Sequence, residues 1–108
     1  MAKVTLNISR DEYQPQYYNV VVNGEGFYNS VNKSVGARIR GEDSFSDDKL
    51  FSIGGTGQRV LPGGTFVLHE LVHGSKLNED WGQDEIYALV NVEGLSGSFK
   101  TNTVTGNY

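Results

Sequence analysis

Apolar and polar residues alternate along much of this chain, in short runs that end at turn-forming residues. Every second residue is apolar in the segments 4–8, 35–40 and 86–92. A period of two is the pattern of a β-strand that buries one face and exposes the other. We therefore expect a buried face on each strand, formed by Val4, Leu6 and Ile8, by Val35, Ala37 and Ile39, and by Ile86, Ala88, Val90 and Val92.

Other segments have the composition of strands, and turn signals separate them. Runs of this kind lie at 17–22, 50–53, 58–61 and 98–105. The glycine-rich sequence at 54–57 is expected to be a loop. Turn residues recur roughly every 8 to 12 residues, the spacing of a sandwich or barrel rather than of alternating strands and helices. The pattern predicts an all-β chain in which residues 1–108 form a single antiparallel β-sandwich domain of roughly seven to eight strands.

One local feature sharpens the expected topology. The segment from Asp84 to Tyr87 (DEIY), at the start of a late strand, resembles the tyrosine corner of immunoglobulin-like sandwiches. The Cys pair and buried Trp of true immunoglobulin domains are missing, because the chain has no Cys and Trp81 lies in a polar stretch. The resemblance implies an immunoglobulin-like topology and carries nothing about function. The Thr-rich run at 98–105 is the expected edge strand.

The composition supports one folded domain and argues against several classes of protein. The chain has 108 residues, of which 37% are hydrophobic and 20% charged, so it can bury a core. Its formal net charge is -4 and its 9 basic residues are scattered along the sequence, which disfavours nucleic-acid binding. It has no Cys, and therefore no disulfide or thiolate chemistry. No run is typical of a signal peptide or a membrane span, so cytoplasmic localisation is the default expectation.

The only two histidines of the chain belong to a motif with known metal chemistry. His69, Glu70 and His73 lie in the sequence HELVH, which matches the H-E-x-x-H pattern of zinc peptidases. On a helix both imidazoles would share one face, with Glu70 beside them as the general base. The motif would then resemble that of gluzincins, which implies a carboxylate as the third Zn²⁺ ligand. Glu79 and Glu93 are the candidates by position.

The same residues also fit a β-strand, which is the interpretation we favour. A helix in this place would have only about eight residues, several of them β-branched, and no second helix is predicted that would pack behind it. As a strand, Phe66 and Leu68 point to one side, and a single bulge would bring Leu71 to that side as well. We therefore expect extended backbone at 66–73 and keep a small zinc metallopeptidase as the alternative function.

Two predicted loops are rich in carboxylates. Alternate connections of a sandwich emerge at the same end, so we expect these loops to converge. Carboxylates that lie close together repel each other unless a cation lies between them, and Ca²⁺ takes several oxygen ligands. The arrangement is similar in pattern to the loop-end calcium sites of C2-type sandwiches; the alternative is that both loops are ordinary solvated turns. The expected ligands are Glu42, Asp43, Asp47 and Asp48 in one loop and Glu79, Asp80, Asp84 and Glu85 in the other.

Together these patterns favour a binding module without catalytic activity. Phe45 and Trp81 each lie inside an acidic loop, where an aromatic side chain is typical of a contact with a partner. The 6 Tyr residues suggest carbohydrate as the other class of ligand, since aromatic rings stack on sugars. We expect a protein or carbohydrate partner, loops ordered by Ca²⁺, and Zn²⁺ only under the peptidase alternative.

Overall fold

The computed structural model describes residues 2–42, 48–77 and 84–108. The regular structure of these residues consists of β-strands and two single-turn 3₁₀ helices, η1 (Tyr28–Ser30) and η2 (Gly74–Lys76). The strands are β1 (Lys3–Arg10), β2 (Tyr17–Glu25), β3 (Ser34–Gly41), β4 (Asp48–Arg59), β5 (Phe66–His73), β6 (Asp84–Val92), β7 (Phe99–Lys100) and β8 (Val104–Gly106). None of the described helices is long and apolar enough to cross a membrane.

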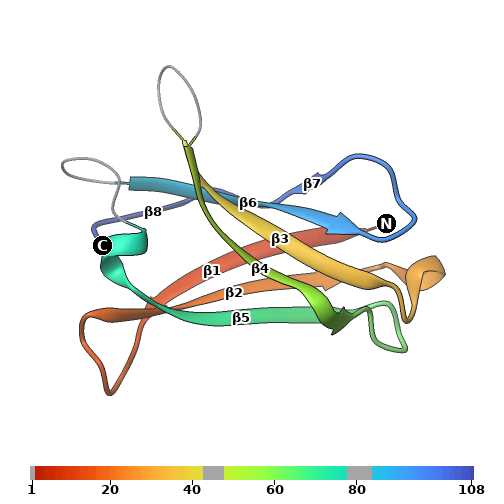
Figure 1. Ribbon diagram of the computed structural model, residues 1–108, viewed down its shortest axis with the longest axis horizontal. Helices are drawn as coiled ribbons and strands as arrows, with labels where there is room; N and C mark the ends of the chain where they lie inside the picture. The colour runs from red at the N-terminus through yellow and green to blue at the C-terminus, as the bar shows by residue number, and fades with distance from the viewer. Residues whose placement is uncertain (1, 43–47, 78–83) are drawn as a thin grey trace.

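The strands form two antiparallel sheets that lie face to face (Figure 1). The three-stranded sheet has the order β1-β2-β5. The five-stranded sheet has the order β4-β3-β6-β7, and β8 also pairs with β6. These observations confirm the prediction of an all-β, antiparallel sandwich. The immunoglobulin-like detail of that prediction stays a prediction.

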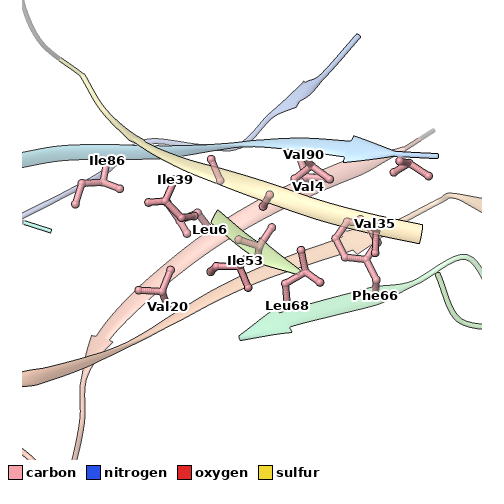
Figure 2. Packing of buried hydrophobic residues seen from close by; sticks show 14 of the residues in the cluster. Val4, Leu6, Val20, Val35, Ile39, Ile53, Phe66, Leu68, Ile86 and Val90 are labelled. Atoms are coloured by element: carbon pink, nitrogen blue, oxygen red, sulfur yellow. The ribbon is translucent and has the colours of Figure 1, made fainter. Parts of the chain in front are cut away.

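The core lies between the two sheets and is built from the alternating faces that the sequence predicts. Ile39, Ile86 and Val90 have 0% exposed surface. Figure 2 shows side chains of both sheets in the same layer, among them Leu6 and Phe66 from the three-stranded sheet. Every residue expected on a buried face lies in this core or packs against it. Period-two alternation therefore identified the buried side of these strands correctly.

Strand β4 differs from the expectation. The chain forms one continuous strand where two strands joined by a loop at 54–57 are predicted. Three glycines of this segment have positive φ angles between 74° and 90°, a conformation that costs glycine little. They accommodate a shift in the pairing with β3 between Ser34 and Gly36. The predicted loop is wrong because a bulge absorbs the irregular backbone without ending the strand. The expected strand at 98–105 is likewise two short strands, β7 and β8.

Candidate binding surfaces

The HELVH segment lies in strand β5, and its backbone is extended as we expect. The Cα atoms of residues four apart on a strand are separated by about 13 Å, since each residue advances about 3.3 Å. His69 and His73 therefore do not lie one helical turn apart on a single face, which is the arrangement that the H-E-x-x-H motif requires. Among the described residues no group of three or more His, Asp or Glu side chains is placed to hold a metal ion. The peptidase alternative therefore lacks the helical geometry on which it depends.

Strand β5 pairs with β2 in one unbroken register, so the bulge considered for this segment does not occur. Phe66, Leu68 and Val72 point into the core and are at most 3% exposed. Leu71 lies on the other side of the strand and is 37% exposed. The outer face of the three-stranded sheet thus carries Leu71 together with both histidines.

His69 belongs to a chain of hydrogen bonds on this outer face. Its Nε2 lies 2.7 Å from Oδ1 of Asn19. The Nδ2 of Asn19 donates to Oδ1 of Asp11 at 3.0 Å, which leaves the amide oxygen to accept from the imidazole. The hydrogen bond from Asn19 holds the pKa of Asp11 below its ordinary value of 3.8, and the backbone N–H groups of Gln14 and Tyr13 act in the same direction. The imidazole is therefore engaged in a polar network on the surface.

His73 has a structural role at the end of β5. Its Nδ1 accepts the backbone N–H of Ser75 at 3.1 Å and lies 3.0 Å from the Ser75 hydroxyl. These contacts cap the 3₁₀ helix η2. The ring of Tyr17 meets the imidazole edge-on, with 5.3 Å between the centroids. Both histidines of the HELVH motif thus have nearby hydrogen-bonding partners that explain them without a metal.

The described residues among the predicted calcium ligands lie at one end of the sandwich. The backbone N–H of Glu42 donates to the carbonyl oxygen of Glu85 at 2.7 Å, so the strand ends next to the two acidic loops lie side by side. Both of these Glu residues are exposed. Asp48 is the first residue of β4. The remaining expected ligands of the two loops, Asp43, Asp47, Glu79 and Asp80, lie outside the described residues, and calcium binding stays a prediction.

Asp84 lies on the opposite side of β6 from Glu85. It is 4% exposed and faces the interior, where it lies near Tyr108. Burial raises the pKa of Tyr108 above its ordinary value of 10.0, and the nearby Tyr18 and Asp84 act in the same direction. The ring of Tyr108 meets that of Tyr18 edge-on at 5.2 Å. Asp84 is therefore part of a buried polar and aromatic cluster at the C-terminus of the chain.

The outer face of the five-stranded sheet gathers cations that look scattered in the sequence. Arg38 and Arg40 alternate with buried residues of β3. The strand register places Arg40 opposite Lys49. It also places Leu89 of β6 between Arg38 and Lys100. We call Arg38, Arg40, Lys49 and Lys100 the cationic face. The sequence shows only part of this face, the two Arg residues that alternate with buried residues in β3. The two Lys residues join them only through cross-strand pairing.

Contacts with the sheet fix two of these cations in place. Nη2 of Arg38 donates to Oγ of Ser98 at 2.9 Å. Nζ of Lys100 lies 4.4 Å from the centroid of the Tyr87 ring, in a cation–π contact. The cationic side chains are therefore partly ordered before any partner binds, which lowers the entropy that binding would cost.

A groove of about 470 Å³ adjoins the cationic face. Strand β3 lies between β4 and β6, so Gly36 forms the floor of the groove, with Gly55 on one side and residues 91–95 on the other. A Cβ atom on Gly36 would lie 2.9 Å from the backbone nitrogen of Gly55, which is too close. Arg38 lines the groove together with Leu95, whose side chain is 41% exposed. The groove thus offers a cation and an apolar contact next to each other.

Comparisons with known proteins bear on the fold. No family model matches the chain, and no curated protein matches it. Among solved structures it is similar to a solution structure described as that of a "putative late embryogenesis abundant (LEA) protein", with a TM-score of 0.53 and 12% sequence identity. The alignment covers 98% of this chain and 69% of the other. At this identity the likeness supports the β-sandwich fold alone.

Proposed function

We propose that this chain is a binding module without catalytic activity, and that it recognises an acidic, extended segment of a partner protein through the cationic face and the adjoining groove. The observation that carries the proposal is the gathering of Arg38, Arg40, Lys49 and Lys100 on one sheet face of a chain whose net charge is -4. The proposal also fits an immunoglobulin-like topology, although a fold by itself does not assign a function.

An anionic partner would be attracted to this face from a distance, because its cations add to one local positive field. The charge pattern therefore supports a partner that brings carboxylates to this face.

The spacing of the cations supports a peptide rather than another anion. Arg38 and Arg40 are two residues apart on one strand, which is about 6.6 Å. An extended peptide presents every second side chain at the same spacing. Carboxylates at alternate positions of such a segment would therefore meet the two guanidinium groups in register.

The surroundings of the face favour a short segment over a long polyanion. Glu42 and Glu85 lie beyond one end of the cationic face, and Glu93 lies beside the groove at the other end. A nucleic acid or a long acidic glycan would extend over these carboxylates and be repelled. The exposed side chain of Leu95 adds an apolar contact that a peptide can use and a polysaccharide cannot.

The test is the affinity of a short synthetic peptide in which Glu alternates with Thr and Leu, measured by fluorescence anisotropy. We expect the double substitution Arg38→Gln/Lys49→Gln to weaken binding about tenfold or more, which corresponds to about 1.4 kcal/mol. We also expect added salt to weaken binding to the wild-type protein. The matched control is Lys3→Gln/Lys33→Gln, which changes the net charge equally and leaves the cationic face intact.

Two results would contradict the proposal. One is equal loss of affinity in both double variants, which would reduce the effect to net charge. The other is a preference for a sulfated oligosaccharide over the acidic peptide, which would make the ligand a glycan.

A second proposal concerns calcium. It is supported by the hydrogen bond between Glu42 and Glu85, which brings together the strand ends that lead into both acidic loops. We propose that Ca²⁺ binds between these loops and orders them, with oxygen ligands drawn from the predicted carboxylates other than the inward-facing Asp84. Calorimetric titration with CaCl₂ after chelation tests this directly. The proposal predicts saturable heat and a raised melting temperature. If no heat is released and the melting temperature is unchanged, Ca²⁺ does not bind these loops.

A further inference from the structure

We propose that the open edge of strand β5 accepts an extended segment of a partner protein that places a basic residue opposite Glu70. This surface is separate from the cationic face, and the inference goes beyond the proposed function. It begins from the strand edges of the two sheets, because an unpaired edge is a template for another strand.

Three described edges of the sandwich are closed or interrupted. The side chain of Asn102 covers the middle of β1, where its Oδ1 accepts the N–H of Leu6 at 2.8 Å and its Nδ2 donates to the carbonyl of Leu6 at 3.0 Å. Strand β4 has two register shifts. Strands β7 and β8 have only 2 and 3 residues. Short strands and bulges discourage pairing with another chain.

Strand β5 is different, because it is a regular edge strand of 8 residues. The N–H of Gly74 donates to the carbonyl of Gln16 at 2.9 Å, which sets the alternation of hydrogen-bonded pairs in this ladder. By that alternation the odd-numbered residues 67–73 direct their backbone groups away from β2, and no described residue pairs with them. Their side chains include Val67 and Leu71, which are 57% and 37% exposed. Backbone donors, backbone acceptors and apolar side chains thus lie together along one edge.

Glu70 makes this edge selective. It occupies the inward phase of β5, between Leu68 and Val72, which are 1% and 3% exposed. Its partner across the ladder, Val20, is fully buried. Glu70 itself is exposed, since β5 has no neighbouring strand on its other side among the described residues. An inward-phase charge on an edge strand is a known obstacle to uncontrolled pairing.

A strand that paired with this edge would cover the carboxylate of Glu70. Burying an unpaired charge is costly, whereas a Lys or Arg in the facing position would satisfy it. A second copy of this chain cannot supply that residue from its own β5, because the strand FVLHELVH contains no Lys or Arg. The charge therefore selects a different chain, one with a basic residue flanked at alternate positions by apolar side chains.

The test uses two labelled peptides that differ at one position. In the first, a central Lys is flanked by Val two residues away on each side, with Thr between; in the second, Glu replaces the Lys. Fluorescence anisotropy should show the Lys peptide binding at least about tenfold more tightly to the wild-type protein. The variant Glu70→Lys should reverse this preference. The variant Arg38→Gln/Lys49→Gln should leave it unchanged, which separates this surface from the proposed function.

Far-ultraviolet circular dichroism checks that Glu70→Lys is folded, and amide NMR spectra of the wild-type protein provide a second measurement. The proposal predicts that the amide signals of Val67, His69, Leu71 and His73 shift when the Lys peptide is added. It is overturned if neither peptide binds or if the preference is the same in Glu70→Lys as in wild type.

Discussion

The two outer faces of this sandwich differ in charge although both belong to antiparallel sheets. The cationic face lies on the five-stranded sheet. The middle of the three-stranded sheet carries only residues without formal charge when the imidazole is neutral. These residues are Thr5, Asn7, Ser9, Asn19, Val21, Asn23, Val67, His69 and Leu71.

This difference determines how each face can recognise a partner. Charges act over a distance of about 8 Å at physiological ionic strength, so the cationic face can steer an acidic segment before contact. An uncharged face acts only on contact, through burial of apolar surface and through hydrogen bonds. Binding to the five-stranded sheet should therefore weaken strongly with salt, and binding along β5 should depend mainly on shape and on the one charge of Glu70.

The greatest loss of stability should follow substitution of two glycines, one in each sheet. A Cβ atom on Gly24 would lie 2.0 Å from Cε2 of Phe66, a fully buried core side chain. On Gly36 it would press against the backbone of Gly55 and fill the floor of the groove. We expect Gly24→Ala to lower the free energy of unfolding by about 3 kcal/mol and Gly36→Ala by about 2 kcal/mol, measured by urea denaturation. Only Gly36→Ala should weaken binding of the acidic peptide.

The control for these substitutions is Gly94→Ala. Gly94 has a φ angle of 88°, and a Cβ atom there would meet no described residue within 4 Å apart from its own neighbours in the chain. The substitution therefore tests backbone strain without crowding, and its expected cost is about 1 kcal/mol. A Gly24→Ala protein as stable as wild type would show that Phe66 has more room than the structure gives it. Equal affinity of all three variants for the acidic peptide would show that the groove does not contribute to binding.

The next effect concerns the edge of β1. Asn102→Ala removes both hydrogen bonds to Leu6, and each is worth about 1 kcal/mol. We expect the free energy of unfolding to fall by about 2 kcal/mol, and hydrogen exchange of the Leu6 amide to accelerate. Asn107→Ala is the matched control, because Asn107 is exposed, and it should change stability by less than about 0.5 kcal/mol. Identical hydrogen exchange of the Leu6 amide in both variants would show that Asn102 does not close the edge of β1.

The weakest effect that we expect is a change in the pKa of Asp11. Asn19→Ala should raise the pKa of Asp11 toward 3.8, because the hydrogen bond from Asn19 is the main cause of its depression. A depressed carboxyl pKa stabilises the folded state above the unfolded pKa, and this contribution is lost as the pH falls through the folded value. The stability difference between wild type and variant that arises from Asp11 should therefore shrink at acidic pH. NMR titration of the Asp11 carboxyl measures the shift, and an unchanged pKa would show that Asn19 does not hold it.

Much of the fold follows from local patterns in the sequence. Alternation identifies the buried faces of β1, β3 and β6, because burial on one side of a sheet dictates a period of two. It also favours the extended form of HELVH, which the structure confirms. The continuity of β4 does not follow, since positive φ angles in a glycine segment are equally compatible with a loop and with a bulge.

The candidate surfaces depend on pairing and are therefore less visible in the sequence. Arg40 and Lys49 become neighbours only through the register of β3 with β4, and Lys100 joins them through β6. Similarly, Glu70 becomes informative only once β5 is known to be an edge strand. Register and strand order depend on contacts between distant residues, which a local pattern does not contain.

The most direct test of the central claim is an amide NMR titration of the intact chain with the peptide that alternates Glu with Thr and Leu. Chemical shifts should change at Gly36, Arg38, Lys49 and Lys100, and these changes should diminish with added salt. Spectra that do not change, or changes confined to β2 and β5, would contradict an acidic-segment site on the five-stranded sheet.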